Sequence, residues 1–244
     1  MTDQRILIAG GGPVGLLCAW LIGRHGLPVR LFDNNSTLQM DLRAATTHPA
    51  TLDLLDDELV ADMARVGLVA PIFQFWDRPS QALVAQFDHA VLKNDTRHPF
   101  VVQCEQFKTT KLVLDRLQPY PNVEVLFDHE VIDVAQNASA VTVQVRGPSG
   151  AVAQHSGAYL IGADGGRSTV RRRSGINSKA SPGRNASSFS PPRSISKPRA
   201  AIATAATSPI PARGAIASRC PPTARPDFGA RSTPQIRRRA SRTF

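Results

Sequence analysis

The stretch from Arg5 to Asp33 constrains the fold of this chain more than any other part of the sequence. It opens with a short apolar run at residues 5–9, the pattern of a strand buried on both faces. A glycine-rich G-x-G-x-x-G segment follows directly. Its glycines are Gly10, Gly12 and Gly15. A buried strand that runs into such a loop predicts the start of a nucleotide-binding βαβ unit.

The rest of this stretch supplies the helix and the second strand of the unit. Residues 16–25 are mostly apolar over the length of a helix, and Gly26 fits its C-terminal cap. Residues 28–32 predict a second buried strand with Asp33 at its carboxyl end. Two strands joined by a helix in this way predict an α/β fold of the Rossmann type. An apolar hairpin with a glycine turn would leave the position of Asp33 unexplained.

Each residue of the motif has a physical role in holding a dinucleotide. Gly10 permits the tight turn from strand to helix, Gly12 lets the backbone approach a pyrophosphate, and Gly15 allows close packing of helix and strand. The free N–H groups at the helix start and the positive end of its dipole face the phosphate charge. Asp33 lies 18 residues after Gly15, where its carboxylate can bond both hydroxyls of an adenosine ribose. Because this carboxylate would repel a 2′-phosphate, the motif predicts FAD or NAD rather than NADP.

The net charge of +10 is distributed unevenly along the 244 residues. Residues 1–177 carry 16 Lys and Arg and 18 Asp and Glu. Residues 178–244 carry 13 Lys and Arg but a single acidic residue. The second segment also holds 10 Pro, 13 Ala and 11 Ser. Such a composition buries too little apolar surface to offset the entropy of ordering the chain. We therefore expect a folded domain at 1–177 and a disordered, Arg/Pro/Ser/Ala-rich tail at 178–244.

Cysteine usage and hydropathy favour a reducing cytoplasm. Cys18, Cys104 and Cys220 are odd in number and lack C-x-x-C spacing, so neither a disulfide framework nor a zinc site is expected. No signal peptide is recognised, and the glycine loop interrupts the apolar stretch 6–22, so no membrane span is expected. Residues 1–177 contain no recognisable nucleophile–base pair or metal cluster. Any catalysis is therefore expected to depend on a cofactor.

The middle of the chain predicts short helices and strands. Helices are expected at 49–55, 57–66 and 105–117, the first of them capped by Thr47 or His48. The expected strands are a pair at 72–76 and 82–87, single strands at 100–103 and 123–127, and an inserted three-stranded meander at 131–135, 140–145 and 151–154.

A second informative stretch lies about 130 residues after the first. A strand at 158–163 runs into Asp164-Gly165-Gly166, and Ser168 then caps the start of a helix. Asp-Gly by itself is a common turn. In open α/β sheets, however, ligands bind outside the carboxyl ends of the strands. We therefore expect Asp164 to share a crevice with the glycine loop.

Together these motifs resemble the class A flavoprotein monooxygenases, the FAD-dependent aromatic hydroxylases of the para-hydroxybenzoate and 3-hydroxyphenylpropionate hydroxylase type. The resemblance covers about residues 4–177 and is most specific at the Asp-Gly element. The matching positions are the glycine motif at 10–15, Asp33, Arg43-Ala44, Gln106 and Gly162-Ala163-Asp164-Gly165-x-x-Ser168-x-Val170-Arg171.

The resemblance implies an FAD site and an oxygen-dependent reaction. The implied FAD-binding residues are Gly10, Gly12, Gly15, Asp33, Arg43, Gln106, Asp164 and Gly165. NAD(P)H would be the co-substrate that reduces the flavin, and O2 would then be used to hydroxylate a small aromatic or phenolic substrate. Asp164 is also implicated in NAD(P)H use. Without the resemblance, Arg43 could be a solvated loop cation, Gln106 an ordinary first-turn residue and His48 a helix cap.

The resemblance ends near Asn177, so the expected form is an incomplete and inactive FAD-binding domain followed by the tail. A one-base slip of the reading frame would make many serines of 178–196 apolar, and a genuine basic tail is the alternative. Two other functions stay open. One is an NAD-dependent oxidoreductase, and the other is a nucleic-acid-binding protein that uses the tail through counterion release. Because the tail's cations are scattered among prolines without interleaved aromatic residues, specific nucleic-acid binding is not expected.

Overall fold

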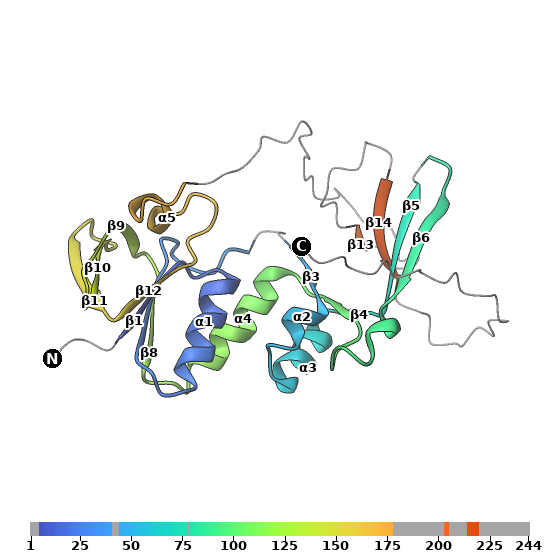
Figure 1. Cartoon of the computed structure of the whole chain (residues 1–244), viewed down its shortest axis with the longest axis horizontal. Coiled ribbons are helices and arrows are strands. Elements are labelled where there is room, and N and C mark those ends of the chain that lie inside the picture. The colour runs from blue at the N-terminus through green and yellow to red at the C-terminus, as the bar shows by residue number, and fades with distance from the viewer. Residues whose placement is uncertain (1–4, 41–43, 78, 178–202, 205–213, 220–244) are drawn as a thin grey trace, which may run out of the picture.

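A parallel sheet at one end of the molecule organises the structure (Figure 1). This computed structural model describes residues 5–40, 44–77, 79–177, 203–204 and 214–219, the last two ranges as backbone only. The sheet has the order β12-β1-β2-β8, and every neighbouring pair is parallel. Its strands are β1 (Ile6–Ala9), β2 (Val29–Phe32), β8 (Val123–Leu126) and β12 (Tyr159–Gly162). The predicted Rossmann-type α/β fold is confirmed.

Helix α1 (Pro13–Gly23) joins β1 to β2, and α4 (Gln106–Leu117) packs beside it (Figure 1). Helix α1 begins three residues before the predicted start, because proline is tolerated at the first helical position, where its missing N–H has no helical partner. Its end also comes earlier than predicted. Gly26 adopts a φ of +78° and donates its N–H to the Gly23 carbonyl at 2.9 Å, so residues 24–26 form a turn.

The two faces of the parallel sheet are covered by different layers. On one face, Ile8 and Leu31 pack in a core with α1 and α4. On the other face, Leu7 and Phe32 pack against an antiparallel meander. The meander has the order β11-β10-β9, with β9 at Glu130–Gln136, β10 at Val141–Arg146 and β11 at Val152–Gly157. Burial on both faces is why β1 and β2 are continuous apolar runs in the sequence.

A small helical region follows the second strand. It contains α2 (Pro49–Leu52), α3 (Asp57–Val66) and a sheet of order β3-β7-β4, whose strands are Thr46–Thr47, Val101–Gln103 and Leu68–Ala70. Helix α2 is three residues shorter than predicted, and His48 takes its N-cap position without a side-chain hydrogen bond. Strands β3 and β4 were not predicted, since two or three residues are too few to show an alternating pattern.

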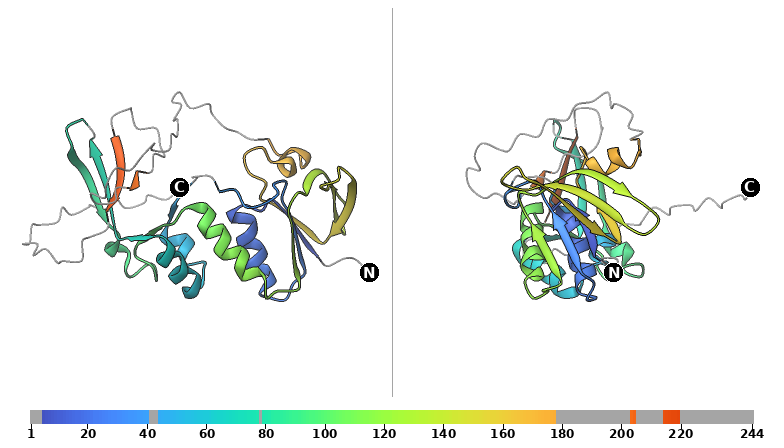
Figure 2. Two further views of the ribbon diagram at one scale, coloured as in Figure 1. Left: turned by 180° about the vertical axis from the view of Figure 1, so that it is seen from behind. Right: turned by 90° about the vertical axis from the view of Figure 1, so that its left-hand side faces the viewer.

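The far end of the molecule is built on a β-hairpin, which lies well away from the parallel sheet in Figure 1 and in the left view of Figure 2. Strands β5 (Ile72–Asp77) and β6 (Ala82–Asp88) pair as predicted, and a 3-10 turn, η1 (His89–Leu92), follows. Two further strands, β13 (Ala203–Thr204) and β14 (Gly214–Arg219), extend this sheet in the order β13-β14-β5-β6.

Strands β13 and β14 differ from the expectation that residues 178–244 are disordered throughout. Residues 214–219 pair in antiparallel register with 72–77. A strand can join a sheet edge through backbone hydrogen bonds alone, whatever its side chains. The low apolar content of this segment therefore did not reveal the pairing. None of the described helices is long and apolar enough to cross a membrane.

Candidate functional site

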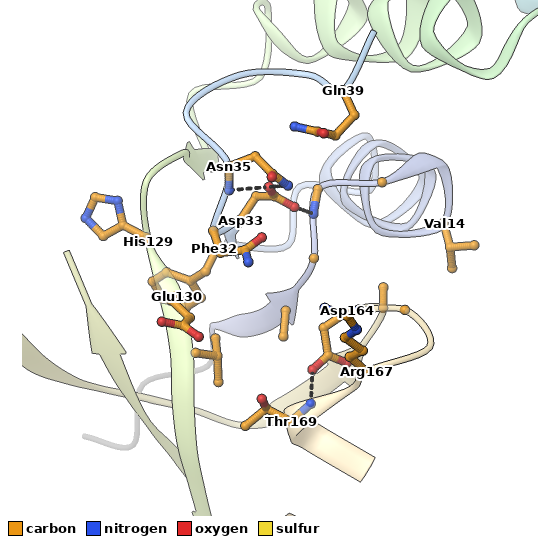
Figure 3. A pocket seen from close by; sticks show the side chains of 18 of the residues that line it. Val14, Phe32, Asp33, Asn35, Gln39, His129, Glu130, Asp164, Arg167 and Thr169 are labelled. Atoms are coloured by element: carbon orange, nitrogen blue, oxygen red, sulfur yellow. Dashed lines mark hydrogen bonds between the residues drawn. The ribbon is translucent and has the colours of Figure 1, made fainter. Parts of the chain in front are cut away.

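A cleft of about 870 Å³ lies at the carboxyl ends of β1, β2 and β12 (Figure 3). Its walls come from the glycine loop, the segment after β2, the start of α4, the start of β9 and the loop after β12. The loop after β12 leads into α5 (Thr169–Arg173). The two motifs singled out in the sequence therefore meet in one crevice, as their positions after parallel strands predicted.

The three motif glycines are required for three different reasons. Gly10 has a φ of +103°, and a Cβ there would overlap the carbonyl group of Ala163. A Cβ on Gly15 would overlap the carbonyl oxygen of Gly10, so α1 could not approach β1. By contrast, a Cβ on Gly12 would meet nothing within 4 Å. Gly12 therefore faces open space at the start of α1, where a ligand can approach the backbone.

Asp33 is held rigidly beside the glycine loop. Its Oδ2 accepts the N–H of Gly11 at 2.5 Å. Its Oδ1 accepts the backbone N–H of Asn35 at 2.8 Å and the side-chain amide of Asn35 at 2.7 Å (Figure 3). Two carboxylate oxygens offer about four acceptor positions, and three are occupied. The carboxylate therefore retains capacity for a ligand hydroxyl and has little freedom to turn away.

Asp164 closes the opposite wall of the cleft. Its Oδ2 accepts the N–H of Thr169 at 2.6 Å and that of Val170 at 3.1 Å, which fixes the carboxylate at the start of α5. Its Oδ1 is buried without a hydrogen-bond partner among the described residues. A buried acceptor left in this state costs about 1–3 kcal/mol. A ligand hydroxyl or N–H in the cleft would remove that cost.

Residues in and beside the loop after β12 stabilise its conformation. Gly165 adopts a φ of +74°, which a side chain would strain. The hydroxyl of Ser168 accepts the N–H of Arg171 at 2.9 Å, so the predicted cap at Ser168 is confirmed. The N–H of Ala163 donates to the Ala9 carbonyl at 2.7 Å and thereby joins the two motifs directly.

The other residues singled out in the sequence are Gln106, Arg43 and His48, and they differ in their relation to the cleft. Gln106 is the first residue of α4, lines the cleft and donates its backbone N–H to the Ala44 carbonyl at 3.0 Å. Arg43 lies outside the described residues. His48 does not line the cleft.

Sequence reasoning missed several residues of the cleft wall: Asn35, Gln39, Thr110, His129, Glu130, Arg167 and Arg172. Asn35 carried a recognisable signal, because Asn two residues after an Asp commonly bonds the preceding turn. The others belong to segments whose approach to the cleft depends on packing. Within the described ranges, no group of three or more His, Cys, Asp and Glu residues could hold a metal ion.

The geometry of the cleft fits a dinucleotide. One wall offers a fixed carboxylate, the loop between the walls offers open backbone at a helix start, and the other wall offers an unpartnered carboxylate oxygen. These groups match a ribose diol, a pyrophosphate and a further hydroxyl or N–H donor, respectively.

Comparison with known proteins identifies the family. A model of the FAD binding domain family matches residues 3–201, and the chain belongs to that family. The match extends past residue 177, the boundary expected from composition. It also supports FAD over the alternative of an NAD-dependent oxidoreductase.

Individual relatives agree with this assignment. The chain is 31% identical over 176 residues to para-nitrophenol 4-monooxygenase of Pseudomonas sp. strain WBC-3, an alignment that covers 72% of this chain and 43% of the relative. It is 30% identical to a 3-(3-hydroxy-phenyl)propionate/3-hydroxycinnamic acid hydroxylase of Mycolicibacterium smegmatis, covering 70% of this chain and 30% of that protein.

A solved structure shows the same fold. The crystal structure of p-nitrophenol 4-monooxygenase PnpA from Pseudomonas putida DLL-E4 superimposes with a TM-score of 0.67 at 32% identity, covering 71% of this chain and 44% of that one. The chain thus spans less than half the length of the relatives that it matches.

Proposed function

We propose that this chain provides the FAD-binding part of an NAD(P)H- and O2-dependent monooxygenase that hydroxylates an aromatic or phenolic substrate. The observation that carries the proposal is the 31% identity to a para-nitrophenol 4-monooxygenase over 176 residues. Membership of the FAD binding domain family supports the choice of cofactor. The ring substrate and O2 are proposed from the names of the relatives.

In this proposal, different walls of the cleft bind different parts of FAD. Asp33 accepts hydrogen bonds from the adenosine ribose, while Gly12 and the first turn of α1 face the pyrophosphate. Gly10 and Gly15 shape the loop, and the buried Oδ1 of Asp164 accepts a hydrogen bond from the cofactor. The remaining proposed FAD contacts are Arg43, Gln106 and Gly165.

Bound FAD supplies the redox chemistry, accepting a hydride from NAD(P)H and activating O2. The chain's own residues bind and orient the cofactor. The two carboxylates are fixed by backbone donors on opposite walls, so neither has to reorganise when a ligand arrives. Such preorganisation lowers the entropic penalty of binding.

We also propose that residues 1–177 form the FAD-binding unit and that 178–244 is a segment of different character, which the split in charge supports. The spacing of the cysteines supports a reducing cytoplasm as the compartment.

The proposal is tested by identifying the cofactor of the full chain. We expect the purified protein to release FAD on denaturation, and the bound flavin to be bleached by a reduced nicotinamide nucleotide in the absence of oxygen. Release of FMN, or of NAD without any flavin, would contradict the assignment.

A further inference from the structure

The connection from β8 to β9 is bonded directly to the segment that carries Asp33. The backbone N–H of His129 donates to the Asp33 carbonyl at 2.8 Å, and the N–H of Asp128 donates to the Asn35 carbonyl at 2.9 Å. In the other direction, the Asp33 N–H donates to the Leu126 carbonyl at 2.9 Å. Three backbone hydrogen bonds therefore anchor the loop after β2 to the end of β8 and to the connection that follows it.

Asp128 gives this connection an unusual backbone conformation. Its φ is +56°, in the left-handed region that residues with a side chain rarely adopt. Among the described residues other than glycine, only Gln81 in the β5–β6 hairpin also has a positive φ, at +54°. Such conformations persist where the surrounding structure holds them, and they occur preferentially at functional sites. Aspartate is one of the few side chains that tolerate this region well.

The conformation of Asp128 sets the directions of two N–H groups. One is its own N–H and the other is that of His129, and the φ and ψ of Asp128 fix the angle between them. In the left-handed conformation, the first reaches Asn35 and the second reaches Asp33. The His129 ring stabilises the same arrangement, since its Nδ1 lies 2.6 Å from the Phe127 carbonyl and the contact spans Asp128. An ordinary φ at Asp128 would turn one of the two N–H groups away from its acceptor.

The bonds reach the proposed ribose site through two residues. Asp33 is held by its own carbonyl. Asn35, whose backbone and side-chain N–H groups donate to the Asp33 carboxylate, is held by its carbonyl as well. Asp128 itself is exposed and does not line the cleft, whereas His129 lines it on the Asp33 side (Figure 3). A direct contact between Asp128 and a ligand in the cleft is therefore not expected, and its influence passes through the backbone.

We propose that Asp128 is a positioning residue, whose left-handed backbone holds the loop after β2 so that the Asp33 carboxylate meets the hydroxyls of an adenosine ribose. This inference rests on the proposed function, because that function assigns the ribose to Asp33. A carboxylate with about one free acceptor position binds a hydroxyl well only at a fixed distance and direction. The anchored loop supplies both before the ligand arrives.

The test compares two probes that differ only in the ribose hydroxyls, ADP and 2′,3′-dideoxy-ADP, titrated calorimetrically into the full chain. We expect the unmodified chain to bind ADP at least about tenfold more tightly, in line with one hydrogen bond to a charged group. Asp128→Val should lose most of that preference, because a β-branched side chain fits a positive φ poorly. Asp128→Gly removes the same charge but adopts the left-handed conformation freely, so it should keep the preference to within about twofold.

This readout separates positioning from a general loss of structure. A merely structural defect would weaken both probes equally, whereas a misplaced Asp33 weakens ADP alone. In an Asp33→Ala background, Asp128→Val should change the preference no further, because the group on which it acts is gone. The N–H of Gly11, which is bonded to the Asp33 carboxylate, should exchange its hydrogen faster in Asp128→Val than in Asp128→Gly. If Asp128→Val does not fold, Asp128→Ala repeats the comparison with a smaller side chain.

The matched control is Gln81→Val in the hairpin. It places the same side chain at the other described non-glycine residue with a positive φ, which does not line the cleft. This control should leave the preference for ADP unaltered.

The outcomes distinguish this inference from the proposed function. An equal preference in Asp128→Val, Asp128→Gly and the unmodified chain would overturn the positioning role, and so would an unmodified chain that retains FAD but binds both probes alike. A loss in Asp128→Gly as large as in Asp128→Val would assign the effect to the aspartate side chain and would overturn it as well. If the preference depends on the conformation at Asp128 while the chain retains no flavin, Asp128 still positions Asp33 and the proposed function fails.

Discussion

The two ends of the molecule differ in how much of their apolar side chains is buried. In the parallel sheet, Leu7, Ile8 and Leu31 are entirely buried, with 0% of their surface exposed. In the hairpin, Val84 is 69% exposed and Phe87 is 56% exposed. Packed side chains cover both faces of the parallel sheet, whereas no such layer covers β6 in the described part of the chain.

Local contacts hold the hairpin together instead. On one face, the rings of Phe73 and Phe75 meet edge to face at 4.8 Å, and Phe87 lies across from them. Elsewhere on the hairpin, the Trp76 indole donates to Gln74 at 3.1 Å, and Gln74 donates to Gln86 at 2.5 Å. The cleft is therefore built on a parallel sheet that is packed on both faces, while the hairpin depends on cross-strand pairs worth roughly 0.2–1 kcal/mol each.

The largest expected effect is the loss of the folded cleft when Gly15 is replaced. In Gly15→Val the branched side chain would overlap the Gly10 carbonyl, so α1 would have to move away from β1. We expect destabilisation of more than about 3 kcal/mol and no FAD binding. Urea unfolding followed by circular dichroism measures the first effect. Gly12→Ala is the control, which should fold normally and still lose FAD affinity, because only the approach of a ligand is obstructed.

Truncating one apolar side chain at each end tests the comparison directly. We expect Leu31→Ala to lower the free energy of unfolding by about 2–5 kcal/mol, because it leaves a cavity in a sealed core. Phe87→Ala should cost less than about 1 kcal/mol, since more than half of that ring is already in water. Chemical denaturation of both variants is the measurement. Equal losses would mean that the hairpin is as tightly packed as the sheet.

Removing a carboxylate from each end separates FAD binding from local structure. Asp33→Ala should weaken FAD binding about 10- to 100-fold, because it removes the proposed ribose contact and leaves the Gly11 and Asn35 donors unpartnered. Asp88→Ala in the hairpin removes a comparable cap, since Asp88 accepts the N–H of Ala90 at 2.9 Å. FAD affinity should not change in the Asp88 variant. A similar loss in both would show that the effect on FAD is indirect.

The smallest expected effect is a dependence of stability on pH. Burial lowers the pKa of His155, and the adjacent Arg30 guanidinium lowers it further, while Glu124 opposes the shift. The folded pKa therefore lies below the usual value of about 6.5. Because the unfolded chain then binds the proton more readily, stability is fully present above that value and is lost as the pH falls toward the folded pKa. Unfolding midpoints between pH 7 and pH 5 should show this loss, and His155→Gln should diminish it.

Much of the fold was predictable because its signals are local. The run before Gly10, the helix-length segment after Gly15 and the alternation in the meander depend only on neighbouring residues, and the structure has these elements close to the predicted bounds. The predictions failed where sequence patterns are short or absent. Strands β3 and β4 are too brief to show a period, and β14 joins β5 through backbone pairing.

The cleft shows the same division between local pattern and long-range contact. The sequence by itself determined the turn at Gly10, the carboxylate at Asp33 and the cap at Ser168, because each follows from residues close by in the chain. The sequence also predicted that Asp164 shares a crevice with the glycine loop, and the register that pairs Ala9 with Gly162 brings the two together. Only the tertiary structure decided that Thr110 of α4 and Glu130 of β9 line the same cleft. Their approach depends on how α4 and the meander pack on the two buried faces of one sheet, and that packing joins residues far apart in the sequence.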